Sequence, residues 1–494
     1  MSYKYYRKDG RYGMIKEAGG LRTIVSTKDA VPTTIYSVDK KLDEALTIPR
    51  TKKKRDRHVT IGSGTRNPDT IDEKGYPPVE ESLPVALQVA KMLYSVLGGC
   101  STTGSSYDTP KTDTIASGGG TATLTLTTGG LSVDAHIGDQ MEVTSGDNTG
   151  NVYNIIDNDA STLTLDKTTP ANIDADGIKI TTAPFLHTIT EENTPEDMPT
   201  FAWQFELENN TDAQSIREVL LGVLHDALEI LIEVDATAQQ TVDIKGAKSV
   251  TASELDRPTD LDNAEIYHWC GVKVNNLSHN SVNLAETVNK IQININNNAE
   301  LKQIEGDCYA NDAMFGTRDY TIIINIHPTK NTLRALRNED LPYTHTLAYT
   351  VEIYRVGGSF STAKTDIIAS GEGTTTVTLT TGGLTVDAHI GDFLKITDPG
   401  YTDKYYYITD NDAGTITTET PVPVNCDSAN VEIIWGAYIK LVFDDIYVDV
   451  YDDEIPAADA KEYGLDVEFK NNGGGTLAVT SEDDLNCAHY EGSS

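Results

Sequence analysis

Lys111 begins the stretch KTDTIASGGGTATLTLTTGGLSVDAHIGDQMEVT, and Lys364 begins a second copy, KTDIIASGEGTTTVTLTTGGLTVDAHIGDFLKIT. About three in four positions match across these two stretches, and the register continues without a gap into Asp-Asn-Asp at 157–159 and 410–412. The alternation in TATLTLTT and the frequent Gly, Asn and Asp predict short strands joined by turns. The repeat therefore indicates a duplicated all-β module, a compact barrel or a sandwich, of about seventy residues.

Composition restricts the classes of function. The 494 residues have room for about three or four domains, and 75 acidic against 39 basic residues give a formal net charge of −36. Such a surface repels nucleic acid, which argues against reading a base sequence or gripping phosphates. It suits a wall past which DNA slides without sticking. Adaptation to a salty environment is an alternative explanation of the same acidity.

The cysteines and the chain's hydropathy indicate a soluble product made in the cytoplasm. The five cysteines are scattered and show no metal-binding or disulfide spacing, so we expect thiols in a reducing compartment. No apolar run is long enough to cross a bilayer, and the polar first residues do not resemble a signal peptide. We expect no membrane insertion.

Outside the repeats, strands dominate the expected structure. A helix is predicted over 82–97, with Ser82 as N-cap, Pro84 in its first turn and glycines at its end, after a loop over 62–78. Residues 216–234 fit a helix in their first half and a strand in their second, which we expect to pair with 241–244; residues 247–263 resemble a linker. Further strands are expected at 201–208, 270–274, 288–296, 320–327, 347–354, 438–451 and 465–469, with a short helix at 331–336.

Acidic residues recur on one face of two expected strands. Side chains alternate between the faces of a strand. Two sets of acids thereby share a face opposite apolar residues: Glu229, Glu233 and Asp235, and Asp445 and Asp449. They form either an ordinary solvated sheet face or the acidic inner wall of a channel.

One basic run stands out in this acidic chain. Its residues are Arg50, Lys52, Lys53, Lys54, Arg55 and Arg57. It is either a solvated loop or a contact between stacked subunits, and in the second case assembly depends on salt.

Three patterns that could mark chemical sites have simpler interpretations. The repeated acids Asp157, Asp159, Asp410 and Asp412 could bind calcium, but the twelve-residue loop with a terminal Glu is missing, and we favour turns. The glycines at 118–120 have no following GK[ST], and His136 and His389 have no nearby Cys or second His. We predict no enzyme, no cofactor and no metal.

The second half of the chain outside the repeat resembles the major tail tube proteins of long, non-contractile-tailed viruses. The resemblance is carried by a strand ending in Asn-Asn-Asn, a Gly-Arg loop, a second strand, a helix and two closing strands, at 288–300, 316–326, near Leu333, 438–446 and 463–471. The first half is similar over 55–61, 84–97, 201–208 and 218–248.

This resemblance implies a mainly β fold with two tandem tube domains. Each would be a β-sandwich with a flanking helix, whose sheet joins its neighbours into a closed barrel. The implied division is tube copy 1 at 1–105 with 184–248, insert 1 at 106–183, a linker at 249–263, tube copy 2 at 264–360 with 434–485, and insert 2, Ig-like or a small barrel, at 361–433.

The implied function is structural. Three chains, each with two tube domains, would form a pseudo-hexameric ring; rings would stack into a virion tail around an acidic bore for the genome, with the inserts outside. Partners would be further copies, other tail proteins (tape measure, terminator, tip) and, transiently, DNA, with assembly in the host cytoplasm. The alternative is a receptor- or glycan-binding adhesin, or a capsid decoration protein, with twin β modules.

Overall fold

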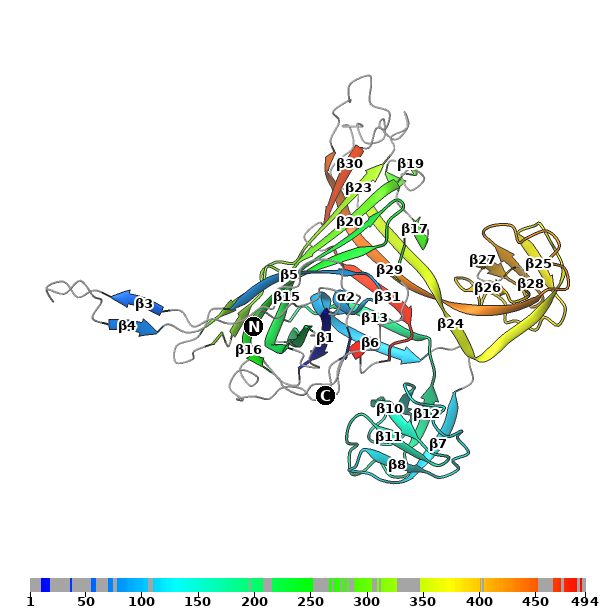
Figure 1. Cartoon of the computed structure of the whole chain (residues 1–494), viewed down its shortest axis with the longest axis horizontal. Helices are drawn as coiled ribbons and strands as arrows, with labels where there is room; N and C mark the ends of the chain where they lie inside the picture. Colours follow the sequence, from blue (N-terminus) through cyan, green and yellow to red (C-terminus); the bar gives the residue numbers. More distant parts are fainter. Residues whose placement is uncertain are drawn as a thin grey trace, which may run out of the picture.

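Antiparallel β-strands form one large body and two small attached modules (Figure 1). The mainly β fold expected from the sequence is confirmed. The computed structural model describes residues 10–17, 36–37, 55–58, 70–73, 78–104, 110–194, 197–207, 216–251, 266–268, 271–275, 278–279, 282–283, 288–303, 309–310, 312–326, 347–399, 401, 404–451, 465–471, 475–486 and 489–490.

The body is organised around one long, curved sheet, which we call the main sheet. Every neighbouring pair in it is antiparallel. Its strands follow the spatial order β5 (Val79–Ala86), β16 (Gln239–Thr251), β15 (Ile216–Glu233), β20 (Val288–Asn296), β23 (Asp319–Ile326), β30 (Leu465–Asn471), β29 (Asn430–Tyr451), β24 (Leu347–Ser370) and β17 (Val272–Asn275).

The main sheet has one apolar and one polar face. On β20, Ile291, Ile293 and Ile295 are fully buried, while the alternate side chains are only half-buried. The same alternation holds along β23 and β30. Because a strand's side chains alternate with a period of two, the sequence of each strand dictates which face enters the core.

A second layer covers the apolar face. β1 (Gly10–Lys16) pairs with β2 (Tyr36–Ser37) and with β14 (Phe201–Leu207), and β14 joins β15. Similarly, β6 (Gly98–Gly104) pairs with β13 (Phe185–Glu191), which pairs with β31 (Leu477–Asp483) and so reaches β29. Outside the two repeats, the remaining described strands form three small hairpins: β3 (Arg55–His58) with β4 (Thr70–Glu73), β18 (Ser278–His279) with β19 (Val282–Asn283), and β21 (Glu300–Lys302) with β22 (Asp312–Met314).

The two predicted tube copies share one sheet and one core. β15 of the first pairs directly with β20 of the second, and a single hydrophobic core cluster extends from Tyr12 to Tyr490. The described residues therefore show one body, and the tandem duplication stays a prediction. The helix expected at 331–336 lies outside the described residues.

The first repeat folds as a closed six-stranded barrel, barrel 1, with its own apolar core. Of the two forms that the sequence left open, the barrel is confirmed. Its strands are β7 (Lys111–Ser117), β8 (Thr123–Leu126), β9 (Gln140–Val143), β10 (Val152–Asn158), β11 (Thr162–Leu165) and β12 (Gly177–Thr181).

The second repeat, barrel 2, has the same cyclic pairing. Its own strands are β25 (Thr376–Leu379), β26 (Phe393–Ile396), β27 (Tyr405–Asn411) and β28 (Thr415–Thr418). The outer parts of β24 and β29 complete the cycle, so these two strands run without interruption from the main sheet into barrel 2. The expected strand 347–354 is accordingly much longer.

The helix predicted over 82–97 is wrong in its first half. Residues Val79–Ala86 form β5, and the Ser82 hydroxyl donates to the Asp243 carboxylate across the β5–β16 pair instead of capping a helix. Helix α2 covers only Lys91–Leu97 and ends at Gly98, whose φ of 98° favours glycine. All seven residues of α2 are buried, which stabilises a helix too short to persist alone.

Three boundaries are also corrected. The loop expected over 62–78 contains β4, and the linker expected over 247–263 begins with the end of β16. The segment 216–234, for which the sequence favoured a helix and then a strand, forms the single strand β15. Both halves of β15 pair with β16, as the predicted hairpin required. On its other side the first half pairs with β14 and the second with β20. Backbone pairing on both sides overrides the helical spacing of its leucines.

Candidate functional site: the polar face of the main sheet

The polar face carries aligned rows of side chains. One row runs through Glu233, Lys290, Asn325 and Asp466 on four adjacent strands, as the strand register places them opposite one another. Within it, Lys290 lies 3.4 Å from Glu233, and the Asn325 amide donates to Asp466 at 2.7 Å. These are exposed or half-exposed contacts, each worth under about 1 kcal/mol.

Two of the predicted acids lie on this face. Glu229 and Glu233 point the same way from β15, and Glu229 accepts a hydrogen bond of 2.8 Å from the Gln292 amide. Asp235 does not belong to the strand: it follows β15 in an exposed turn, with φ of 60°.

Asp445 marks a bulge that the sequence did not predict. Phe443 and Ile446 are both buried although they are three residues apart, because β29 gains one residue relative to β24 here and Asp445 adopts a φ of 55°. Simple alternation through Asp445 is therefore wrong. The side chain of Asp449 lies outside the described residues.

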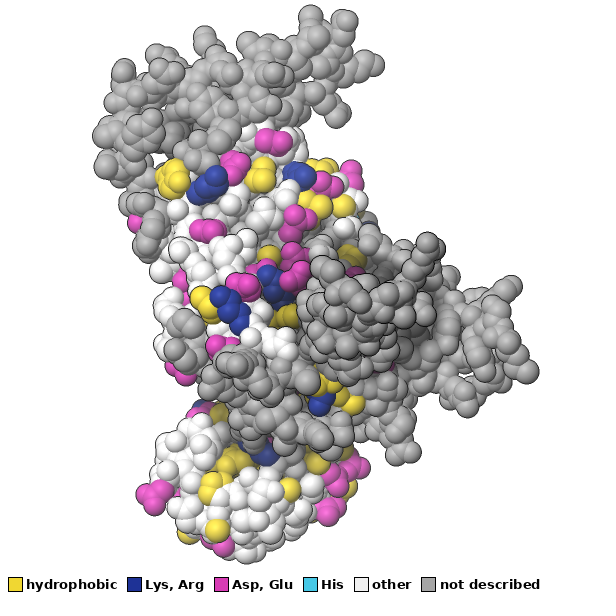
Figure 2. Space-filling model, turned by 90° about the vertical axis from the view of Figure 1, so that its left-hand side faces the viewer, with side chains coloured by type: hydrophobic (Ala, Val, Ile, Leu, Met, Phe, Trp, Pro, Cys, Tyr) yellow, Lys and Arg dark blue, Asp and Glu magenta, His cyan; other side chains and the backbone are white. Residues whose placement is uncertain are grey.

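The face is mixed and not uniformly acidic. Figure 2 shows acidic and basic side chains interspersed on the described surface above barrel 1. On β15, β20, β23 and β30, the half-buried or exposed positions of this face carry the carboxylates Glu229, Glu233, Asp319, Asp466 and Glu468 against Lys290 and Lys470.

The basic run is only partly described. Arg55 and Arg57 lie on β3, opposite Glu73 and Ile71 of β4. Arg50, Lys52, Lys53 and Lys54 lie outside the described residues.

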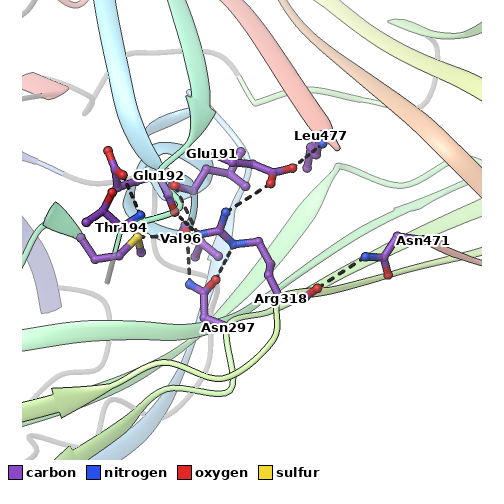
Figure 3. Close-up of polar contacts among 10 residues, drawn as sticks. Val96, Glu191, Glu192, Thr194, Asn297, Arg318, Asn471 and Leu477 are labelled. Atoms are coloured by element: carbon purple, nitrogen blue, oxygen red, sulfur yellow. Dashed lines mark hydrogen bonds and ion pairs between the residues drawn. The ribbon is translucent and has the colours of Figure 1, made fainter. Parts of the chain in front are cut away.

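A largely buried arginine, with a side chain that is 13% exposed, ties the main sheet to the second layer (Figure 3). The Arg318 side chain, just before β23, donates from Nε to Asn297 Oδ1 at 2.7 Å and from Nη2 to the Glu192 carbonyl at 3.2 Å. Its Nη1 lies 3.5 Å from Glu191 Oε2, and the other oxygen of Glu191 accepts from the Leu477 N–H.

Asn297 extends this network to the helix. Its amide donates to the Val96 and His225 carbonyls at 2.8 and 3.1 Å. The Asn-Asn-Asn and Gly-Arg segments that carried the family resemblance thus meet here and join both halves of the body. Sequence reasoning singled out these segments without predicting their contact.

The repeated Asp-Asn-Asp segments, expected as turns, end strands β10 and β27: their first two residues are paired with β11 or β28, and only Asp159 and Asp412 lie in the connections that follow. Their aspartates are exposed, whereas the central Asn158 and Asn411 are buried, and each accepts the N–H of the equivalent histidine, His136 or His389, at 2.8 Å. Each histidine pairs through Nδ1 with an aspartate three residues later, Asp139 or Asp392, also at 2.8 Å. Among the described residues, no group of three or more His, Cys, Asp and Glu side chains could hold a metal ion.

A buried hydroxyl–imidazole–carboxylate chain links β6, β13 and β31. Thr102 Oγ1 lies 2.9 Å from His187 Nδ1, and His187 Nε2 lies 3.1 Å from Asp483 Oδ1. Burial opposes ionisation, but His187 and the hydrogen bonds from Tyr490 and Leu485 lower the pKa of Asp483. The Tyr490 ring stacks on His187, and both side chains are fully buried. We interpret this chain as structural because the His187 imidazole and the Asp483 carboxylate are both fully buried.

Comparisons with known proteins add no relative. No protein-family model and no curated protein matches the chain. Within the described residues, no helix is long and apolar enough to span a membrane.

Proposed function

We propose that this chain is a structural subunit of a virus tail tube, in which copies join side by side into rings and the rings stack. The observation that carries the proposal is the main sheet itself. It runs through both halves of the chain, buries one face and leaves the other polar. A tube wall needs such a sheet, with its apolar face covered and its polar face toward water.

The two ends of the main sheet support closure with further copies. Among the described strands, β5 pairs only with β16, and β17 pairs only with β24. A strand paired on one side offers backbone groups to another chain, and ring closure removes both exposed edges. On this proposal three chains close a pseudo-hexameric ring, with both barrels outside and the polar face lining the bore.

The polar face also fits genome passage. Its carboxylates outnumber its lysines on the central strands, and the whole chain carries a net charge of −36. DNA phosphates would be repelled weakly and would find no continuous basic path. The proposed role of the face is to let DNA pass without holding it.

Negative-stain electron microscopy of the purified chain over a salt series, with rotational averaging, tests the proposal. The expected result is hollow rings or tubes with three subunits and near-sixfold walls. Monomers or solid trimers without a bore at every salt concentration would refute it.

One observation favours a second candidate, an adhesin or decoration protein. Barrel 2 has a surface cavity of about 470 Å³ lined by Lys364, Asp366 and His389 among others. Discrete oligomers in the same micrographs, together with glycan binding that is lost in Asp366→Ala, would favour this function over the tube.

A further inference from the structure

A second cleft lies where barrel 2 meets the body. It has a volume of about 210 Å³ and is lined by Glu352 and Tyr354 of β24, Tyr438 and Lys440 of β29, Asp392 of barrel 2 and Glu482 of β31. A water molecule occupies about 30 Å³, so the cleft admits a group of several heavy atoms.

Two of its three carboxylates are satisfied by the protein. Glu352 accepts from the Tyr354 hydroxyl at 3.0 Å and pairs with Lys440 at 2.7 Å. Asp392 accepts from the Gly436 N–H at 3.0 Å and pairs with His389.

Glu482 is not satisfied. The residue is 8% exposed and lines the cleft, no hydrogen bond or ion pair joins its carboxylate to another described residue, and its oxygens are not sealed off from solvent. Ionising a largely buried carboxylate that has no protein partner is costly, and a cation that binds beside it offsets that cost.

The cleft also has an aromatic wall. The Tyr354 and Tyr438 rings lie 5.9 Å apart at 42°, and Tyr407 of barrel 2 packs edge-on against Tyr354 at 5.0 Å. Aromatic faces beside a carboxylate attract guanidinium and ammonium groups.

We propose that this cleft binds an organic cation, a guanidinium or primary ammonium group, with Glu482 as its counter-ion. The spacing of the carboxylates does not suit a metal ion, because no group of three among the described residues converges closely enough. The proposal does not depend on the tube function.

Binding is coupled to a proton. Burial, then Asp392 and Asp483, raise the pKa of Glu482 to about 8. The groups facing it are Tyr438 and Lys440 on β29, Glu352 and Tyr354 on β24, Asp392 of barrel 2 and its neighbour Asp483. Below about pH 8 a cation must displace this proton, so its affinity rises about tenfold per pH unit and then levels off.

Isothermal titration of the full chain with methylguanidinium and with butylammonium, at constant ionic strength between about pH 6 and 9, tests this. We expect millimolar binding with that pH dependence. At about pH 9, where Glu482 is ionised, Glu482→Gln should lower the affinity at least about tenfold, and over the whole range it should abolish the pH slope, since one charged contact is lost. Glu372→Gln, on an exposed turn of barrel 2, is the matched control and should bind like the parent chain.

Equal binding by Glu482→Gln, or no binding by the parent chain at several tens of millimolar, would overturn the proposal. Tyr438→Leu gives an independent readout, because it should weaken binding and keep the pH slope. Sedimentation velocity then identifies the source of the cation. Self-association weakened by butylammonium and by Glu482→Gln indicates a basic side chain of a second copy, and unchanged self-association indicates a free small cation.

Discussion

We expect the stability of the body to depend strongly on the side chain of Arg318. It reaches Asn297, Glu191 and the Glu192 carbonyl from a position that is 13% exposed. Removing one partner from a largely buried charged network leaves the others unpaired, which costs more than the network contributes net.

Arg318→Ala should therefore lower the free energy of unfolding by about 3 kcal/mol or more. Arg318→Lys should recover part of this loss, because it keeps the charge without the forked geometry. Urea denaturation measures both, and Asn325→Ala on the polar face is the control, expected within about 1 kcal/mol. A similar small loss for Arg318→Ala would contradict the role of the network.

Glu17 makes stability depend on pH. Burial is the main cause that raises its pKa to about 7, although the Gly222 N–H lies 3.1 and 3.2 Å from its two oxygens and opposes the shift. The folded chain thus retains a proton that the unfolded chain loses from about pH 4.5 upward. The stabilisation is complete below that pH and disappears as pH rises to about 7.

Relative to Glu17→Gln, the parent chain should lose on the order of 3 kcal/mol between pH 4.5 and 8. Urea denaturation across this range measures the difference, and Glu468→Gln on the polar face serves as control. Parallel pH profiles for the parent and Glu17→Gln would contradict the buried proton.

At the scale of elements, the bulge in β29 lets one strand serve two partners. Before the bulge, residues 438–443 of β29 pair with β31, and after it residues 446–451 pair with β30. The extra residue keeps Phe443 and Ile446 both in the core. The bulge therefore joins the second layer to the main sheet.

Asp445→Gly should keep or slightly raise stability, because glycine adopts a φ of 55° without strain. Asp445→Val should cost about 1–2 kcal/mol, since a β-branched residue is disfavoured there. Thermal unfolding compares the two. Equal melting temperatures would argue against a left-handed Asp445, and Thr321→Val on β23 controls for adding a β-branched residue to this sheet.

The barrels differ in how they join the body, and this matters at the scale of the whole molecule. Barrel 1 is entered and left at one place, where Gly104 lies opposite Phe185, and it has a separate core. Barrel 2 continues the body's own strands β24 and β29. We expect barrel 1 alone to be removable.

Replacing residues 105–184 by a short glycine-rich turn should leave the body folded, with strand content by circular dichroism and cooperative melting retained. If the tube proposal is correct, the shortened chain should still form rings in micrographs. Loss of cooperative unfolding would show that barrel 1 is part of the body's core. Replacing residues 371–429 of barrel 2 by the same turn is the matched comparison. It should lower stability or solubility, because it exposes Ile368, Val431 and Ile433 on the outer parts of β24 and β29, which pack in the barrel 2 core.

The hypothesis that the basic run joins stacked subunits belongs to this scale. If the tube proposal is correct, replacing Lys52, Lys53 and Lys54 with glutamine should weaken ring stacking at low salt and reduce its dependence on salt, because ion pairs between subunits are screened. Light scattering over a salt series measures stacking, and a triple lysine-to-arginine variant controls for charge. Unchanged stacking would remove this run from the interface.

The sequence by itself determined the mainly β fold, the two repeats and most strands of the main sheet, because a period of two in short strands with turn residues between them is a local property. It also predicted that Glu229 and Glu233 share a face.

Tertiary structure decided the rest. Val79–Ala86 forms a strand because its backbone pairs with β16. Asp445 interrupts the alternation of side chains because β29 changes its pairing partner from β31 to β30 at this position. Glu482 became an unpaired buried carboxylate, and Arg318 met Asn297, only when residues far apart in the chain were folded together. Long-range backbone pairing and burial set these features, and no local pattern encodes them.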